Sequence, residues 1–198
     1  MNAAVFFQKY GKTICGKILK RIYFPIALRS NHSRVKYLRD AGAEIGTNVN
    51  IGDINMLGTE PFLISIGNNV YFSGNDTLLI THDGGISYTH YMGIAPKRID
   101  SFGKIKIGNN VFVGARCIIL KGVTIGDNCV IGAGSIVTKD IPSGSVACGV
   151  PAKVIKTVQE YYDQSKDNLD DTIGWDMYRK RVYLQEKYRS VNDGGEKE

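Results

Sequence analysis

The chain has 198 residues, of which 43% are hydrophobic and 22% charged, and its formal net charge is +6 at pH 7. This length favours one domain with appended segments, and the apolar content is typical of a soluble globular chain. The apolar stretch at 22–28 is interrupted by Pro25 and is far shorter than the ~20 residues of a membrane span, so we expect no membrane helix. Gln8 and Lys9 break the only earlier apolar run, so we expect no signal peptide. The protein is therefore expected to be cytoplasmic.

The first 42 residues (1–42) are expected to form a basic helical segment. Residues 1–39 hold nine Lys or Arg and no Asp or Glu, which leaves the remainder of the chain with a net charge of −3. Apolar residues at every fourth position predict an amphipathic helix over 3–23, and a second short helix is expected over 33–41. A basic arm fits nucleic acid, an anionic membrane surface or a solvated helix face. No nucleic-acid-binding module is recognisable, so peripheral association with the inner face of the membrane is favoured over nucleic-acid binding.

An aliphatic residue recurs every six positions in the middle of the chain. The positions are Ile107, Val113, Ile119, Ile125, Ile131 and Val137. A helix repeats its buried face about every 3.6 residues and a strand about every two, so this period fits neither element alone. It fits a parallel β-helix, in which each hexapeptide forms one flat side of a coil and its aliphatic residue points inward.

A second set of small or branched residues follows the first set four positions later. Its members are Val111, Cys117, Val123, Cys129, Ser135 and Ile141. Residues two apart share one face of a strand, so these side chains are also predicted to point inward. Four members of the first set are followed by Gly108, Gly114, Gly126 and Gly132. We expect these glycines to adopt backbone angles that other residues resist.

Weaker copies of the repeat begin at Ile45, Ile51 and Ile66, each of which is followed by glycine. Counted at six residues per side and three sides per coil, the repeat region supplies about four coils, each of which needs a stacked neighbour to be stable. The predicted coil domain therefore spans 43–156.

The four cysteines match neither a disulfide framework nor a zinc-site spacing, and the two on inward positions are expected to be core residues.

Two segments lie outside the repeat. Residues 81–104 break the period and predict a loop that protrudes from the coil. Residues 157–198 predict a helical carboxyl-terminal segment of one or two helices. Because the open edge of a terminal coil carries unpaired backbone groups, the helices at the two ends of the chain are expected to cap the coil.

Four segments carry a family resemblance: 107–114 (IGNNVFVG), 122–128 (GVTIGDN), 131–142 (IGAGSIVTKDIP) and 149–156 (GVPAKVIK). They resemble the hexapeptide-repeat acetyltransferases, in particular the galactoside, maltose and polysaccharide O-acetyltransferases. The resemblance implies a mainly β fold, a left-handed parallel β-helix, that uses acetyl-CoA and no metal. It also implies a homotrimer with active sites between neighbouring subunits and a histidine as general base.

The resemblance also assigns the residues that bind acetyl-CoA. Ala115 and Ala133 match the small positions along which the pantetheine arm lies, and Thr138 and Lys139 match positions near the far end of the cofactor. Lys153 and Lys156 match the basic positions that contact the adenosine phosphates. These residue types suit the ligand, because a long thin arm needs small side chains beside it and phosphates need cations and N–H donors.

The chain has three histidines, His32, His82 and His90, and we predict that His82 is the base. It stands at the exit of the coil, where the family carries its base, whereas His32 is expected to be structural. An imidazole of near-neutral pKa suits proton removal from an acceptor hydroxyl, after which the oxygen attacks the thioester and an oxyanion forms. The backbone near Gly114 or Ala115 is the expected source of an N–H for that oxyanion.

A general base needs a partner on its other ring nitrogen. The candidates are Asp53, Asn55, Asp76 and Asp83. The family places a polar residue about thirty positions before the histidine, which favours Asp53 or Asn55 as the further catalytic residue, and both alternatives stay open.

The protruding loop is expected to bind the acceptor. Its candidate residues are Asp83, Tyr88, His90, Lys97 and Arg98, because aromatic faces stack on sugars and cations bind acidic glycans. We favour a hydroxyl of a cell-surface polysaccharide or its precursor as the acceptor. An amino sugar, a small molecule or an antibiotic is the alternative acceptor.

Two further readings of the chain are weaker. The γ-type carbonic anhydrases share this coil but need three zinc-binding histidines, and the spacing of the three histidines here does not fit that site. A non-catalytic scaffold with a membrane-associating basic arm is the non-enzymatic alternative.

Overall fold

The computed structural model describes residues 30–192, and for 190–192 it describes the backbone alone. The helix predicted over 3–23 and most of the basic arm lie outside this range. The chain divides into two compact units, one up to Tyr161 and one from Tyr162 onward. Within the described residues, no helix is both long and apolar enough to cross a membrane.

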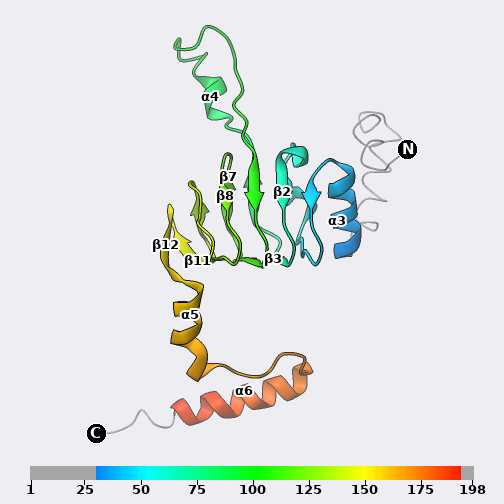
Figure 1. Cartoon of the computed structure of the whole chain (residues 1–198), viewed down its shortest axis with the longest axis vertical. Coiled ribbons are helices and arrows are strands. Elements are labelled where there is room, and N and C mark those ends of the chain that lie inside the picture. Colours follow the sequence, from blue (N-terminus) through cyan, green and yellow to red (C-terminus); the bar gives the residue numbers. More distant parts are fainter. Residues whose placement is uncertain (1–29, 193–198) are drawn as a thin grey trace. The chain divides into compact units, whose positions relative to one another are not determined.

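Three sheets form the three sides of a coil in the first unit (Figure 1). The four-stranded sheet contains β1 (Glu44–Ile45), β2 (Ile64–Ile66), β5 (Ile105–Ile107) and β8 (Thr124–Ile125). The three-stranded sheet contains β4 (Leu78–Ile80), β7 (Ile118–Leu120) and β10 (Ile136–Val137). The five-stranded sheet contains β3 (Val70–Phe72), β6 (Val111–Val113), β9 (Val130–Ile131), β11 (Ser145–Gly149) and β12 (Ala152–Thr157). All neighbours pair in parallel except β11 and β12, which confirms the predicted parallel coil.

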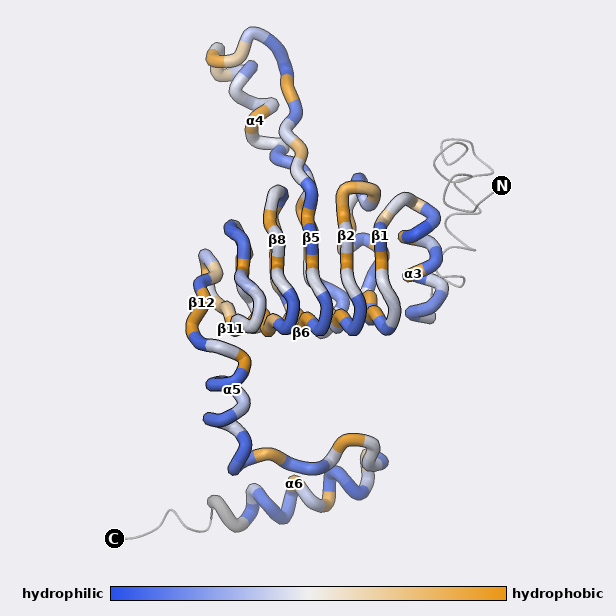
Figure 2. Tube along the Cα trace, viewed as in Figure 1, coloured by the Kyte–Doolittle hydropathy of each residue, from blue (hydrophilic) through white to orange (hydrophobic). Residues whose placement is uncertain are grey.

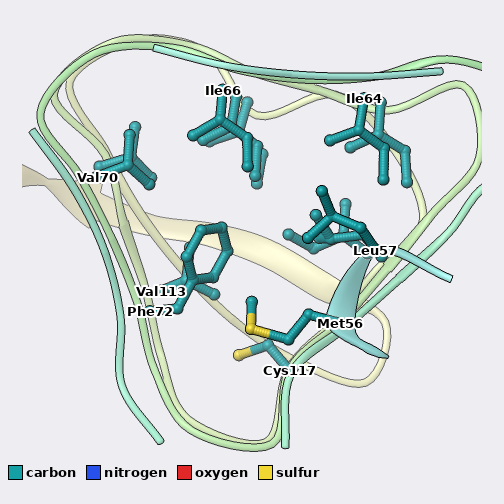
Figure 3. Packing of buried hydrophobic residues seen from close by; sticks show 14 of the residues in the cluster. Met56, Leu57, Ile64, Ile66, Val70, Phe72, Val113 and Cys117 are labelled. Carbon is teal, nitrogen blue, oxygen red and sulfur yellow. The ribbon is translucent and has the colours of Figure 1, made fainter. Parts of the chain in front are cut away.

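The core lies inside the coil and consists of the two predicted sets of inward residues. Every member of both sets is at most 4% exposed, which confirms the six-residue pattern. Figure 3 shows how Ile64, Ile66, Val70 and Phe72 point into this interior from successive sides. Met56 and Leu57, from the short helix η1 (Ile54–Leu57), fill the same space although they lie outside the strict repeat.

The two cysteines on inward positions are core residues, as predicted. Cys117 and Cys129 are free and buried, and burial raises the pKa of both thiols. A raised pKa keeps a thiol protonated and unreactive at neutral pH.

The structure corrects the reason given for the glycines of the repeat. None of the four predicted glycines has a positive φ. Instead, the next coil lies too close for a side chain. A Cβ added at Gly126 would lie 2.6 Å from the backbone nitrogen of Ser143, and one added at Gly67 would lie 2.6 Å from the carbonyl oxygen of Gly108. Real Cβ contacts of this length do not occur, so the stacking of coils requires glycine at these positions.

Asparagines adopt the left-handed backbone at one corner of the coil. Asn48, Asn69, Asn110 and Asn128 have φ between 51° and 56° and lie above one another on successive coils. Each side-chain amide of this column donates to the amide oxygen of the next asparagine at 2.9 Å. Asparagine tolerates this conformation better than most residues, and the column also satisfies its polar side chains at a solvent-exposed corner.

The first coil is capped by α3 (Asn31–Asp40), which confirms the predicted short helix. Asn31 accepts from the N–H of Ile51 and donates to the carbonyl of Val49, so its amide pairs with the coil edge as a strand would. Arg34 and Arg39 donate to further carbonyls of the same edge. These bonds block an edge that would otherwise pair with other chains. At the opposite end of the coil, the antiparallel strand β12 covers β11.

Residues 81–104 leave the coil as a loop that contains the short helix α4 (Gly85–Tyr88) (Figure 1). The base of the loop is closed by antiparallel pairing of His82 with Phe102. The N–H of Asp83 donates to the carbonyl of Ser101, and the N–H of Gly103 donates to the carbonyl of Thr81, both at 2.9 Å. A second excursion between β1 and β2 contains η1 and η2 (Pro61–Leu63). The two excursions supply the residues of the site described below.

Helix α5 (Val158–Ser165) follows β12 and runs across the division between the units. The second unit also contains η3 (Lys166–Asn168) and α6 (Met177–Asn192). Asp170 accepts hydrogen bonds from Tyr183 and Lys187, and the Lys187 ammonium, followed by the Tyr183 hydroxyl, holds the pKa of its carboxyl below the usual value. Arg179 lies 3.8 Å from the centre of the Trp175 ring. These contacts hold the turn before α6 against the helix.

Asn110→Ala is expected to lower the free energy of unfolding by about 1–2 kcal/mol, because the Cβ of alanine lies too close to the following carbonyl oxygen in the left-handed backbone. Asn110→Gly is the matched control, since glycine adopts that backbone freely but also loses the side-chain amide. Urea unfolding at equal protein concentrations measures both variants. Equal losses for alanine and glycine would show that the amide bonds, and not the backbone angle, select asparagine here.

Candidate active site

The candidate site is built around His82, which immediately follows the end of β4 and the buried Thr81. Its imidazole is about half exposed, at 45%, and packs against the Phe102 ring in a T-shaped arrangement with 6.2 Å between the ring centres. The strand fixes the backbone on one side, and the closed base of the loop fixes it on the other. His82 is therefore a reactive side chain on a rigid stretch of chain, with one face open to solvent.

A glutamate that the sequence analysis missed is bonded to this imidazole. Oε2 of Glu60 lies 3.0 Å from Nδ1 of His82 and also accepts the hydroxyl of Thr81 at 2.6 Å. Its other oxygen, Oε1, accepts the hydroxyl of Thr59 at 2.5 Å. Glu60 precedes η2 in the excursion between β1 and β2, 22 residues before His82. The three donors hold the carboxylate, which is only 17% exposed, in one orientation.

The charge state of Glu60 decides which nitrogen of His82 is the free one. Desolvation by itself raises the pKa of Glu60, but hydrogen bonds from Thr59, Thr81 and His82 outweigh it, so that the net shift of the pKa is downward. An ionised carboxylate only accepts hydrogen bonds, so Nδ1 of the neutral imidazole carries the proton. The lone pair then lies on Nε2, where it is available to take a proton from another molecule.

Three of the four predicted partners of His82, the carboxylates, have other contacts in this structure. Asp53 accepts from the N–H of Asn55 and caps η1. Asp76 binds both the N–H and the guanidinium of Arg116, which hold its pKa below the usual value, the N–H being the larger cause. Asp83 accepts from the N–H of Gly85. None of these three carboxylates is bonded to Nδ1 of His82, which is bonded to Glu60 instead.

Asn55, unlike the three acids, lines a cavity beside the histidine. It lines a small cavity of about 80 Å³ together with His82 and residues 78–81 of β4 and its end. Its side chain is exposed and bonds to none of the groups above. Asn55 is therefore placed to touch a molecule beside His82, although it does not orient the imidazole.

The residues predicted to bind the cofactor border the three-stranded sheet. Ala115 and Ala133 occupy the same corner on successive coils, where the N–H of Gly134 donates to the carbonyl of Ala115. Gly74 continues this corner, because a Cβ added there would lie 3.5 Å from Cβ of Ala115. The corner precedes β7 and β10 and presents only small side chains from these three residues.

The opposite border of the same sheet holds His82, Thr138 and Lys139. β10 pairs with β7 and β7 with β4, so the residues that follow β10 lie two coils from those that follow β4. At about 4.8 Å between neighbouring strands, this spacing is about 10 Å. Lys153 and Lys156 lie on β12, in the five-stranded sheet. The structure thus brings His82, the two alanines, Thr138 and Lys139 around the three-stranded sheet. It places Lys153 and Lys156 on the five-stranded sheet.

The outer face of the three-stranded sheet is aliphatic. Its outward residues are Leu78, Ile80, Ile118, Leu120 and Ile136, all exposed or partly buried. The outward residues of the four-stranded sheet are Glu44, Ser65, Lys106 and Thr124, which are polar. An aliphatic sheet face between two rows of candidate site residues is typical of a surface that another molecule covers.

The backbone donor proposed for the oxyanion is corrected in part. The N–H of Gly114 donates to the carbonyl of Ile131 at 2.8 Å, so it belongs to the ladder between coils and is not available. Ala115 remains the candidate.

The acceptor residues predicted in the loop are brought close to one another. Arg98 donates to the buried hydroxyl of Ser87 and lies 5.9 Å from the centre of the Tyr91 ring, which contacts Tyr88 and His90. Lys97 is exposed beside them. Among residues 30–192, no three histidine, cysteine or acidic side chains group as they would around a metal ion.

Comparisons with known proteins agree with this geometry. A family model described as the hexapeptide repeat of succinyl-transferase matches residues 104–139. The chain is 39% identical over 173 residues to Protein CapG of Staphylococcus aureus, and the match covers 86% of this chain and 97% of that protein. It is 42% identical over 120 residues to the galactoside O-acetyltransferase of Escherichia coli (strain K12), across 58% of this chain and 57% of that enzyme.

A solved structure extends the likeness to four-fifths of the chain. A galactoside acetyltransferase in complex with coenzyme A superposes with a TM-score of 0.52 at 30% identity, covering 80% of this chain and 85% of that one. The chain belongs to the hexapeptide-repeat acetyltransferase family. It is thus an acetyltransferase, and its coil is the framework that the family shares.

In this acetyltransferase, Glu60→Ala is expected to move the proton of neutral His82 from Nδ1 toward Nε2, because the acceptor that selects the tautomer is lost. Two-bond proton–nitrogen NMR reports the tautomer, and His82→Gln identifies the resonance among the three histidines. Glu60→Gln is the control, since its amide oxygen still accepts a hydrogen bond. An unchanged tautomer in Glu60→Ala would mean that Glu60 does not orient the ring.

Proposed function

We propose that this acetyltransferase transfers the acetyl group of acetyl-CoA to a hydroxyl of a sugar, with His82 as the general base. The observation that supports this most is the bond between Nδ1 of the half-exposed His82 and Glu60, which leaves Nε2 as the nitrogen that can accept a proton. The acceptor class we favour is a cell-surface polysaccharide or its precursor. The site works on a left-handed coil in a cytoplasmic enzyme.

The residues divide the chemistry between them. Nε2 of His82 takes the proton from the acceptor hydroxyl while the oxygen forms a bond to the acetyl carbonyl carbon, and Glu60 stabilises the imidazolium that results. The same proton then passes to the leaving thiolate, so that the base returns to its neutral form. In the trimer, Ala115 of a neighbouring subunit would offer its N–H to the oxyanion, because Ala115 and His82 of one chain lie on opposite borders of the sheet. Asn55 would contact the acceptor from the same cavity as His82.

Acetyl-CoA supplies the thioester, and the small corner fits its narrow arm. Gly74, Ala115 and Ala133 would lie along the pantetheine, because none of these three residues carries a side chain larger than a methyl group. Thr138 and Lys139 continue the path, and Lys153 and Lys156 would hold the adenosine phosphates as cations. The coenzyme A complex of a relative at 30% identity supports this choice of ligand.

The loop residues would bind the acceptor. Tyr88 offers an aromatic face for a sugar ring, while Lys97 and Arg98 suit an acidic glycan, with His90 and Asp83 as polar partners. The galactoside O-acetyltransferase relative supports a sugar acceptor.

The active form would be a homotrimer in which a second copy covers the aliphatic face of the three-stranded sheet. That face runs between His82 on one border and Ala115 and Ala133 on the other, so a neighbouring subunit seated there would complete the site. The polar outer face of the four-stranded sheet gives no such reason for contact.

Replacing His82 with alanine is expected to lower kcat/KM by about 10²–10⁴-fold, the usual effect of removing a general base. Turnover is measured by release of free coenzyme A thiol across a panel of sugar acceptors. Lys106→Glu, on the polar sheet, serves as a control for handling and folding. Full turnover in His82→Ala would rule out this histidine as the base.

Ile118→Glu is expected to dissociate the trimer, because a carboxylate on the aliphatic face would be desolvated at the subunit contact. Sedimentation velocity gives the mass in solution, and circular dichroism checks that the coil remains folded. Lys106→Glu, at an outward position of the four-stranded sheet, should keep the wild-type mass. If both variants sediment as the wild type does, the three-stranded sheet does not form the contact.

A further inference from the structure

The part of the protruding loop farthest from the coil exposes large apolar side chains. We define the loop tip as Tyr88, Tyr91, Met92 and Ile94, which are 62%, 67%, 67% and 75% exposed. Figure 2 shows this apolar stretch at the far end of the loop, away from the sheets. The assignment of the loop to acceptor binding uses Tyr88, Lys97 and Arg98 but gives no role to Met92 or Ile94. Aliphatic side chains do not match the hydroxyl-rich surface of a saccharide, so another partner must account for them.

The charges nearest to the loop tip along the chain are positive. Lys97 and Arg98 follow the tip directly and both are exposed, whereas the acidic residues of the loop, Asp83 and Asp100, lie nearer its base. Apolar and aromatic side chains beside cations fit a surface that is negatively charged outside and apolar beneath. A soluble protein partner requires no such combination.

The loop tip is presented on an ordered support. Within the loop, Arg98 donates to the hydroxyl of Ser87, which is 5% exposed, and its guanidinium also lies over the Tyr91 ring. His90 Nδ1 bonds to the carbonyl of Ala95 at 3.1 Å. Because these bonds form inside the loop, the tip meets a partner with little further ordering of its backbone.

We propose that the loop tip docks on an anionic lipid surface. Met92 and Ile94 enter the boundary between headgroups and acyl chains, and Tyr91 lies at headgroup level. The positive charge of Lys97 and Arg98, which are assigned above to the acceptor, attracts the anionic surface without direct contact. Docking depends on the loop tip and not on the acetyl transfer, so binding and turnover are separate measurements.

Co-sedimentation of the full chain with phosphatidylcholine vesicles containing about one-third phosphatidylglycerol tests the proposal. Met92→Ser with Ile94→Ser is expected to lower vesicle partitioning by about 10-fold or more, because two large apolar side chains leave the interface. Ile173→Ser is the matched control, since Ile173 is 95% exposed but lies outside the loop. Partitioning should fall for pure phosphatidylcholine and at high salt.

A second measurement does not depend on losing binding. The chain has one tryptophan, so Met92→Trp adds a single reporter at the loop tip. Lipids brominated in the upper acyl chain are expected to quench the fluorescence of this added tryptophan in anionic vesicles. The quenching measured for the wild-type protein, which has only its native tryptophan, is the reference. Turnover with a soluble sugar acceptor should be unchanged in the double serine variant, which also shows that it is folded.

Three results would overturn the proposal. The first is equal partitioning of the wild type and the double serine variant, which includes the absence of binding by both. The second is a Met92→Trp variant that brominated lipid does not quench. The third is loss of the wild-type mass in the double serine variant with vesicle binding retained, because the loop tip would then dock on another copy of the chain.

Discussion

The close stacking of successive coils is the constraint on which the rest of the structure depends. Each coil is joined to the next by parallel backbone hydrogen bonds along three sheets, and this pairing leaves no room for a side chain at the start of each corner. Glycine at positions such as Gly67 and Gly126 follows from that crowding. The asparagine column and the capping helix α3 follow as well, because corners and open edges carry backbone and side-chain groups that the ladder does not satisfy.

The same stacking converts distant parts of the sequence into neighbours. Residues that follow β4 and β10 stand along one border of the three-stranded sheet, although more than fifty positions separate them in the chain. The candidate site uses this geometry: the regular coil supplies a flat aliphatic face with a narrow corner of small residues. The irregular excursions supply the reactive groups, His82 from one and Glu60 from the other.

Much of this could be predicted because the repeat is local and periodic. The inward positions, the buried cysteines and the short helix before the coil were all anticipated, since each depends only on which residues recur at which spacing. His82 was selected as the base from its position at the end of the coil. The partner of His82 could not be found in this way. Glu60 lies in a segment without a period, and a rule of spacing along the chain favoured Asp53 and Asn55, which the structure bonds elsewhere or only brings near.

The sequence by itself determined the coil, its interior and the family, because a six-residue period admits one way to bury its aliphatic residues and because several motifs occur in order. The tertiary structure alone decided why glycine stands at each corner, since the obstacle is the next coil and not the local backbone. It also decided the pairing of Glu60 with His82 and the assembly of the candidate site around one sheet. Those contacts join segments whose separation along the chain says nothing about their distance in space.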